Sequence, residues 1–70
     1  MKAKEMFERL GYKWNEITND REDLIIYYNE RRLVFYKRRR LVGKDGLETG
    51  LTPGEIQAIH QQCKELGWFD

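Results

Sequence analysis

Several features that support catalysis, metal binding or export are scarce in this 70-residue chain. Cys63 is the one cysteine, so no disulfide can form within the chain, and a single thiol is typical of a cytoplasmic protein. His60 is the one histidine, and a structural zinc ion needs four ligands, so these two residues do not predict a metal site. We expect no cofactor and no metal. Stability must then come from an aromatic core or from oligomerisation.

Long hydrophobic runs and an excess of one charge are also absent. The longest apolar stretch, residues 24–28, is too short to span a bilayer, and no apolar run follows the first residues as in a signal peptide. With 13 basic and 12 acidic side chains, the net charge is +1. That balance argues against bulk attraction to nucleic acid or to a membrane surface. The sequence therefore predicts a cytoplasmic protein with no membrane partner.

Aromatic residues are plentiful instead, with 2 Trp, 4 Tyr and 3 Phe. A chain of this length forms one domain, residues 1–70, and buries only about 60% of its unfolded surface. Each aromatic side chain can bury on the order of 150–250 Å², which makes a dense aromatic core the expected source of stability. High charge combined with high aromatic content argues against disorder.

One short sequence motif occurs twice, as residues 8–12 (ERLGY) and residues 64–68 (KELGW). Each is typical of a last helical turn followed by a glycine stop and an apolar residue that packs back on the helix. Apolar residues at helical spacing predict the first helix over residues 2–10. The second helix begins after Thr52, where Thr52 and Glu55 form a capping box with Pro53 at the first helical position, and it ends at Gly67.

The segment between the helices is rich in β-forming residues. It predicts strands over residues 12–17, 23–28 and 32–36. Residues 37–40 either turn, so that residues 40–43 form a short fourth strand, or extend the third strand to Val42; we favour the turn. Three glycines from residue 43 to residue 50 predict a mobile loop. The fold class is α+β: an antiparallel three- to four-stranded meander, α-β-β-β-(β)-α, with both helices on one face.

A second face of the sheet then carries apolar side chains that no helix covers. One assignment of the strand faces places Ile25, Tyr27, Val34 and Tyr36 there. The opposite assignment instead places Leu24, and the side chains that share its face, on this outer side. Either the polar tips of the tyrosines make this face tolerable in water, or another molecule covers it.

Residues that resemble a catalytic set are sparse. His60 and Cys63 share a helix face, but no third group or oxyanion donor accompanies them. Asp20, Glu22 and Asp23 cluster in a predicted turn rather than in a cleft. We therefore expect the protein not to be an enzyme.

The basic run Arg38, Arg39 and Arg40 is the sharpest candidate for a binding site. Arginines beside aromatic residues on a sheet can hold single-stranded nucleic acid by phosphate pairing and base stacking. The alternatives are a solvated turn, a charged guard that protects an edge strand from aggregation, or a contact with an acidic protein partner. Our first hypothesis is a non-enzymatic protein-interaction module, either a homodimer or the binder of an unidentified protein. Its anchors would be Trp14, Tyr27 and Tyr36.

The two ends of the chain resemble a group of small uncharacterised proteins of Gram-positive bacteria and their phages. The resemblance rests on the opening, residues 3–12, and on the close, residues 51–56 together with residues 65–68. It implies an accessory protein encoded by a prophage or mobile element, and it brings no assigned activity and no site residues. The arginine run departs from the strand-turn-strand middle of that group.

Overall fold

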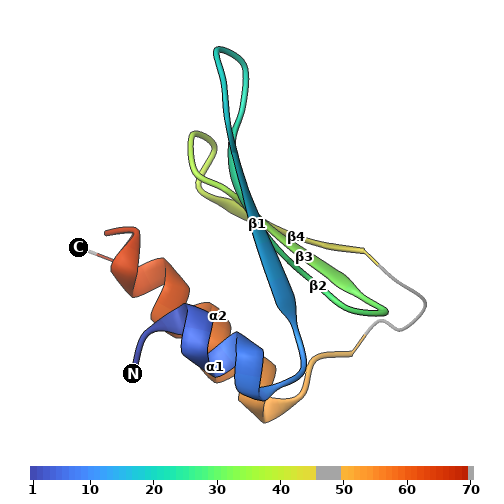
Figure 1. Ribbon diagram of the computed structural model, residues 1–70. Helices are drawn as coiled ribbons and strands as arrows, with labels where there is room; N and C mark the ends of the chain where they lie inside the picture. Colours follow the sequence, from blue (N-terminus) through green and yellow to red (C-terminus); the bar gives the residue numbers. More distant parts are fainter. Residues whose placement is uncertain (46–49, 70) are drawn as a thin grey trace.

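The computed structural model describes residues 1–45 and 50–69. Its elements in chain order are α1 (Ala3–Arg9), β1 (Lys13–Thr18), β2 (Asp23–Tyr28), β3 (Arg32–Tyr36), β4 (Leu41–Asp45) and α2 (Pro53–Glu65). The strands form one antiparallel sheet in the order β1-β2-β3-β4 (Figure 1). The predicted α+β meander and its fourth strand are confirmed. The mobile loop predicted from the glycines falls mainly on residues 46–49, which lie outside the described residues.

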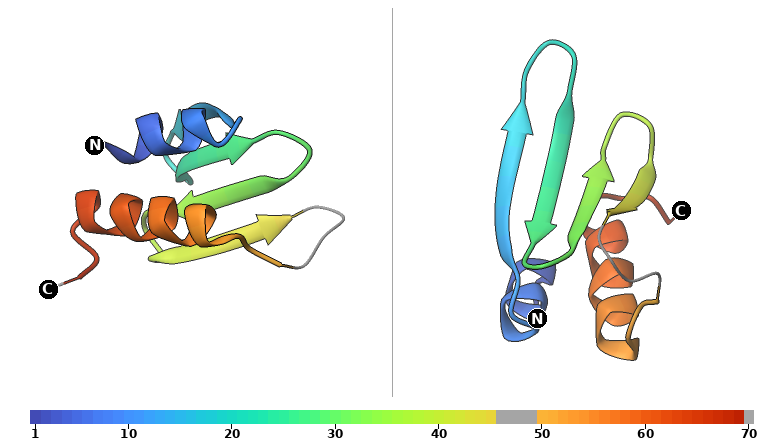
Figure 2. Two further views of the ribbon diagram at one scale, coloured as in Figure 1. Left: turned by 90° about the horizontal axis from the view of Figure 1, so that it is seen from below. Right: turned by 90° about the vertical axis from the view of Figure 1, so that its right-hand side faces the viewer.

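Both helices lie on the same side of the sheet, as expected (Figure 1). They run antiparallel and side by side, with α1 over the β1–β2 half and α2 over the β3–β4 half (Figure 2). The core between the layers is aromatic, because the ring of Phe7 from α1 stacks on Tyr27 with centroids 3.8 Å apart. Phe35 meets both rings edge-on, and Ala58 supplies a small, fully buried contact from α2.

The repeated sequence motif forms the same type of helix C-terminus in both places. Gly11 and Gly67 have φ of +92° and +73°, a left-handed conformation that glycine adopts without steric cost. In each case the following aromatic donates its backbone N–H across five residues, Tyr12 to Phe7 and Trp68 to Cys63, both at 3.0 Å. The Tyr12 ring then packs on Phe7, and Trp68 packs against the core.

The helix N-termini are capped in two different ways. The capping box predicted for α2 is present: the Thr52 hydroxyl accepts from the Glu55 amide, and the Glu55 carboxylate accepts from the Thr52 amide. At the N-terminus of α1, Glu5 Oε1 accepts from the Lys2 amide at 3.3 Å, and a second carboxylate comes from the other helix, because the Ala3 amide donates to Glu65 Oε2 at 2.7 Å. This bond joins the beginning of α1 to the end of α2.

The arginine run forms a turn rather than an extension of β3, as favoured. The Arg40 amide donates to the Tyr36 carbonyl at 2.8 Å, which closes the turn between β3 and β4. Arg40 has φ of +57°, a region that L-residues other than glycine rarely occupy. The fourth strand starts one residue later than expected and runs two residues further, over Leu41–Asp45.

Of the two assignments of side chains to the faces of the sheet, the first was wrong for β2. Asn29, Glu30 and Arg31 connect β2 to β3, and this connection sets Tyr27 opposite Leu33 and Ile25 opposite Phe35. Residues paired across an antiparallel ladder share a face, so Tyr27 points into the helix-covered core, where its exposure is 0%. The inverted facing, with Leu24 outside, is the correct one for this strand.

Candidate interaction surface

We call the side of the sheet without helices the open face. The pairing registers assign to it three rows of side chains that cross the sheet from β1 to β4. The polar row is Lys13, Tyr28, Arg32 and Asp45. The middle row is Asn15, Ile26, Val34 and Gly43. The apolar row is Ile17, Leu24, Tyr36 and Leu41.

The centre of the open face is partly covered by its own side chains. Leu24 and Val34 are each only 8% exposed although no helix lies above them. Tyr36 contributes to this cover by lying against Gly43, where an added Cβ would come within 3.0 Å of its ring. The apolar groups left accessible are at the two ends, with Tyr28 40% exposed and Leu41 54% exposed.

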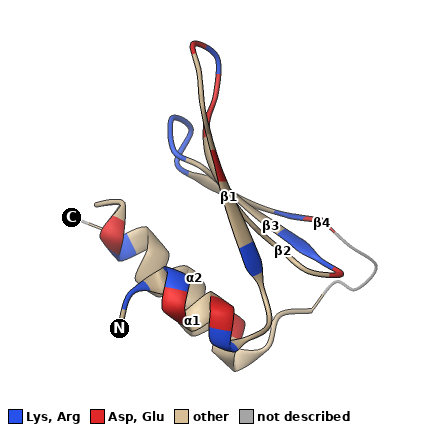
Figure 3. Ribbon diagram, viewed as in Figure 1, with Lys and Arg blue, Asp and Glu red and all other residues tan. Residues whose placement is uncertain are grey.

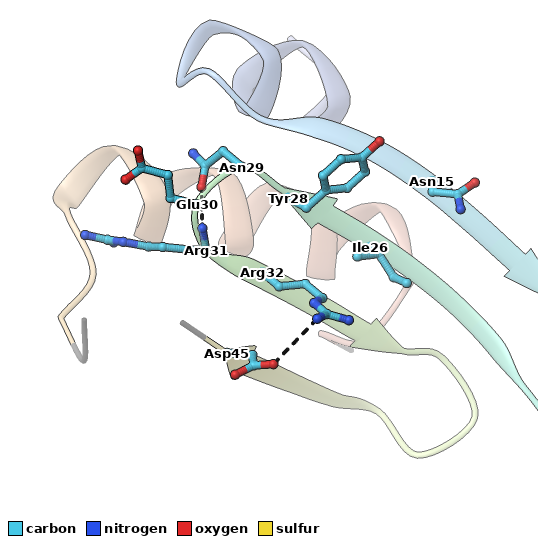
Figure 4. Close-up of a pocket in the computed structure, with 8 residues that line it drawn as sticks. All are labelled: Asn15, Ile26, Tyr28, Asn29, Glu30, Arg31, Arg32 and Asp45. Atoms are coloured by element: carbon cyan, nitrogen blue, oxygen red, sulfur yellow. Dashed lines mark hydrogen bonds and ion pairs between the residues drawn. The ribbon is translucent and has the colours of Figure 1, made fainter. Parts of the chain in front are cut away.

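A shallow hollow occupies the polar end of the open face and continues over the β2–β3 turn (Figure 4). Tyr28 and Ile26 give it an apolar floor, and Asn15 and Arg32 border it. Arg32 and Asp45 form an exposed ion pair of 3.8 Å across β3 and β4. A protein partner would meet an apolar floor with a charged rim here, the usual composition of an interface.

A second hollow lies at the opposite end, beside Tyr36 and Leu24, where the two hairpin turns come together. Arg21 and Glu22 line it from the β1–β2 turn, and Arg39 lines it from the β3–β4 turn. Figure 3 shows that basic and acidic residues are both present at this end of the sheet. The charge here is mixed rather than uniformly basic.

Two of the three arginines of the basic run are engaged in holding the fold. Arg38 donates to the backbone carbonyls of Asn19 and Asp20, at 3.0 and 2.8 Å, and so ties the two hairpin turns together. Arg40 donates to the Trp68 carbonyl at 2.6 Å. Arg39 is the member of the run left to face solvent beside Tyr36. Two of the three guanidinium groups of this turn therefore already donate hydrogen bonds within the fold.

The three predicted aromatic anchors are not brought together. Tyr36 lies on the open face, but Tyr27 is buried, and its hydroxyl donates to Gln62 on α2. Trp14 pairs with Tyr27 and therefore lies on the helix side, where the Lys4 ammonium sits 3.8 Å from its ring centroid. Sequence reasoning missed Tyr28, because the partner of each strand residue depends on turn geometry that is not visible in the alternation of β2.

A buried polar cluster joins α2 to the rest of the molecule. The Glu55 carboxylate, whose residue is 6% exposed, accepts from the Tyr12 hydroxyl and from Arg31 Nη1 at 3.0 and 3.1 Å. Arg31 also donates to the Gly50 carbonyl at 3.1 Å. Burial by itself would raise the pKa of Glu55, but the Thr52 amide, the Tyr12 hydroxyl and the Arg31 charge outweigh it and lower that pKa.

The same cluster raises the pKa of Tyr12 to about 12, first by burial and then through its hydrogen bond to the Glu55 carboxylate. All hydrogen-bonding groups of Glu55 serve the fold. The sequence signals the capping role of this residue but not its long-range partners, because Tyr12 and Arg31 belong to other elements.

The remaining candidate residues form no reactive group. Cys63 is buried, and burial raises the pKa of its thiol, whereas His60 is exposed and stacks on Phe69. Asp23 pairs with Lys37 at 3.4 Å, and its neighbours in the β1–β2 turn are exposed. Within residues 1–45 and 50–69, no group of His, Cys, Asp or Glu is arranged to hold a metal ion. No helix in that part of the chain has the length and apolar character needed to cross a membrane.

Comparison with protein-family models, with curated proteins and with solved structures finds no match to this chain.

Proposed function

We propose that this protein is a non-enzymatic protein-interaction module whose contact surface is the open face of the sheet. On the sequence resemblance described above, it would serve as an accessory protein of phage or prophage type. The observation that carries the proposal is that β2 and β3 present apolar side chains on both faces although helices cover only one. These open-face residues are Leu24, Ile26, Tyr28, Val34 and Tyr36.

The composition of the open face supports this function. A chain that needed only a solvated outer face would carry alternating polar residues along its central strands. Here the middle positions are Ile26 and Val34, and Tyr28 and Arg32 stand at the accessible end. Tyrosine and arginine are the residue types that most often anchor protein interfaces. The surface therefore resembles an interface more closely than a solvated sheet.

Site-specific photo-crosslinking in living cells tests this function. A photoreactive amino acid at Tyr28 or Leu41 places the probe at either end of the open face, on side chains that are already exposed. The same probe at Gln57, an exposed position on α2, is the matched control. We expect discrete adducts from the open face and none from α2. Equal labelling from all three positions, or no adducts at all, would contradict the proposal.

A second function, binding of single-stranded nucleic acid, has one specific observation in its favour. Arg39 and Arg21 border the hollow beside Tyr36, so two guanidinium groups and an aromatic ring are available together. Fluorescence anisotropy with short DNA and RNA strands at about 50 mM salt tests it, because phosphate contacts weaken steeply as salt rises. Arg39→Ala should reduce binding and Arg9→Ala, on α1, should not. An absence of binding at low salt would remove this function.

A further inference from the structure

The side chains of the open face are arranged so that β1 and β4, its two edge strands, carry complementary groups in each row. Its polar row begins with a cation, Lys13 on β1, and ends with an anion, Asp45 on β4. Its apolar row begins with Ile17 and ends with Leu41 on the same two strands. Each row therefore carries at its two ends groups that would suit each other if a second copy lay above it with β1 over β4.

A twofold axis that runs along the strands between β2 and β3 produces this superposition. It places Lys13 of one copy over Asp45 of the other, and Tyr28 of one copy over Arg32 of the other. In the middle row, it sets Ile26 against Val34. Every row then meets a complementary row, with a charge pair and a cation–π pair at one end and apolar contacts through the rest.

The charges of the hairpin turns also complement each other under this twofold rotation. The turn between β3 and β4, residues 37–40, is wholly basic, and the turn between β1 and β2, residues 19–22, is net acidic, with Asp20 and Glu22 beside the single Arg21. The same axis brings the basic turn of one copy over the acidic turn of the other. Arg39 and Glu22 line the hollow at this end, and neither forms a side-chain ion pair with another described residue. Both charges remain available for a partner.

The other face-to-face arrangement does not fit. An axis across the strands would place the polar row on the apolar row, so that Lys13 would lie over Ile17 and Asp45 over Leu41. Burying these charges against apolar side chains is unfavourable. Charge complementarity therefore selects the arrangement in which the strands of the two sheets run along each other, the aligned packing that stacked sheets commonly adopt at about 30°.

We propose that the occupant of the open face is a second copy of this chain, docked face to face about a twofold axis parallel to the strands. The inference rests on the proposed function and names its partner. Tyr28, Ile26 and Leu41 become buried in the dimer, and the helices form its two outer layers. Lys13 and Asp45 of opposite copies form the charge pairs that fix the register.

The test is a charge-reversal exchange followed by sedimentation velocity at about 10 µM and about 500 µM, a range that detects a dimer with a dissociation constant on the order of 100 µM or below. Lys13→Glu places a carboxylate against Asp45 of the other copy, and Asp45→Lys places an ammonium against Lys13. We expect each variant alone to dissociate at least about tenfold more readily than the wild type. Circular dichroism checks that each variant is folded, which we expect because both positions are exposed and lie on edge strands.

The decisive sample is the equimolar mixture of the two variants. In the mixed pair one contact is the original Lys13–Asp45 pair and the other is the same contact with its signs exchanged, so the heterodimer should reach the wild-type affinity. Lys44→Glu changes charge on the same strand but on the helix side, and it should leave self-association unchanged. A mixture that stays as monomeric as its components would overturn the proposed arrangement.

A wild-type protein that is monomeric at the higher concentration would overturn the dimer itself. The cross-linking experiment separates this result from failure of the proposed function. Adducts from Tyr28 of twice the monomer mass support the dimer, whereas adducts to a different protein reject it and leave the open face as the interaction surface. If no adduct forms at Tyr28 or at Leu41, both proposals fail.

Discussion

Arg31 and Glu55, 24 residues apart in the chain, form an ion pair in which Nη1 lies 3.0 Å from Oε1. The pair joins the β2–β3 turn to the first turn of α2, and the Tyr12 hydroxyl completes it from the end of α1. Three connections between elements therefore converge on one carboxylate.

Removal of this carboxylate should be costly. Glu55→Gln removes the charge that pairs with the Arg31 guanidinium, which is 21% exposed, and that accepts from the Tyr12 hydroxyl, so we expect the free energy of unfolding to fall by about 2 kcal/mol. Urea denaturation measures the change. Arg32→Ala breaks the exposed pair with Asp45 and is the control, with an expected cost below about 1 kcal/mol. Equal effects of the two variants would contradict the assigned role of Glu55.

Stability should also depend on pH through this cluster on the acid side. The folded state lowers the pKa of Glu55, so the folded carboxyl binds its proton less readily than the unfolded one. The stabilisation is therefore complete above the unfolded pKa of about 4.3 and is lost as the pH falls toward the folded pKa. Thermal unfolding from neutral pH down to about pH 3 should show this loss, and Glu55→Gln should flatten the decline.

On the alkaline side, Tyr12 and Tyr27 should act together. Burial raises the pKa of both, that of Tyr12 to about 12, so the unfolded state releases its phenolic protons first. The stabilisation is present below about pH 10, the unfolded value, and is lost as the pH rises through the folded pKa. Phenolate absorbance should rise together with unfolding, and Tyr12→Phe should weaken the coupling. Independent ionisation of these tyrosines in a folded protein would contradict it.

Because Arg40 has a left-handed backbone conformation, substitutions at this position should follow a definite order of stability. Arg40→Ala keeps the unfavourable φ and loses the bond to the Trp68 carbonyl, so it should destabilise by about 1 kcal/mol. Arg40→Gly loses the same bond but relieves about 1 kcal/mol of steric strain, so it should unfold at a higher denaturant concentration than the alanine variant. The reverse order would show that the turn does not impose this conformation.

Because both helices end in the same way, the same substitution should lower stability equally at each end. Gly11→Ala and Gly67→Ala each place a Cβ on a backbone of positive φ, which should lower the free energy of unfolding by about 1 kcal/mol. Gly50→Ala introduces a Cβ that meets no atom of the described residues within 4 Å apart from its chain neighbours, and φ at this position is not positive, so the change should be near neutral. Chemical denaturation of the three variants compares them directly.

Features set by neighbouring residues were predictable from the sequence. The ends of both helices follow from glycine and capping signals within five residues, and β2 and β3 have the predicted bounds. The facing of β2 was assigned wrongly at first, because one residue in the effective length of the 29–31 turn reverses which side chains share a side of the sheet. The cluster around Glu55 and the engagement of Arg38 and Arg40 depend on contacts between distant elements, which no local pattern encodes.

The bond between the Ala3 amide and the Glu65 carboxylate spans 62 positions of the chain. Each strand pairs with its sequence neighbour, so the sheet closes only short loops, whereas the helix pair closes nearly the whole chain. Loop-closure entropy grows with loop length, and the cost of bringing the helices together falls when the strands between them are already paired. We therefore expect the meander to assemble first in folding and α1 to exchange its amide protons first in the native state.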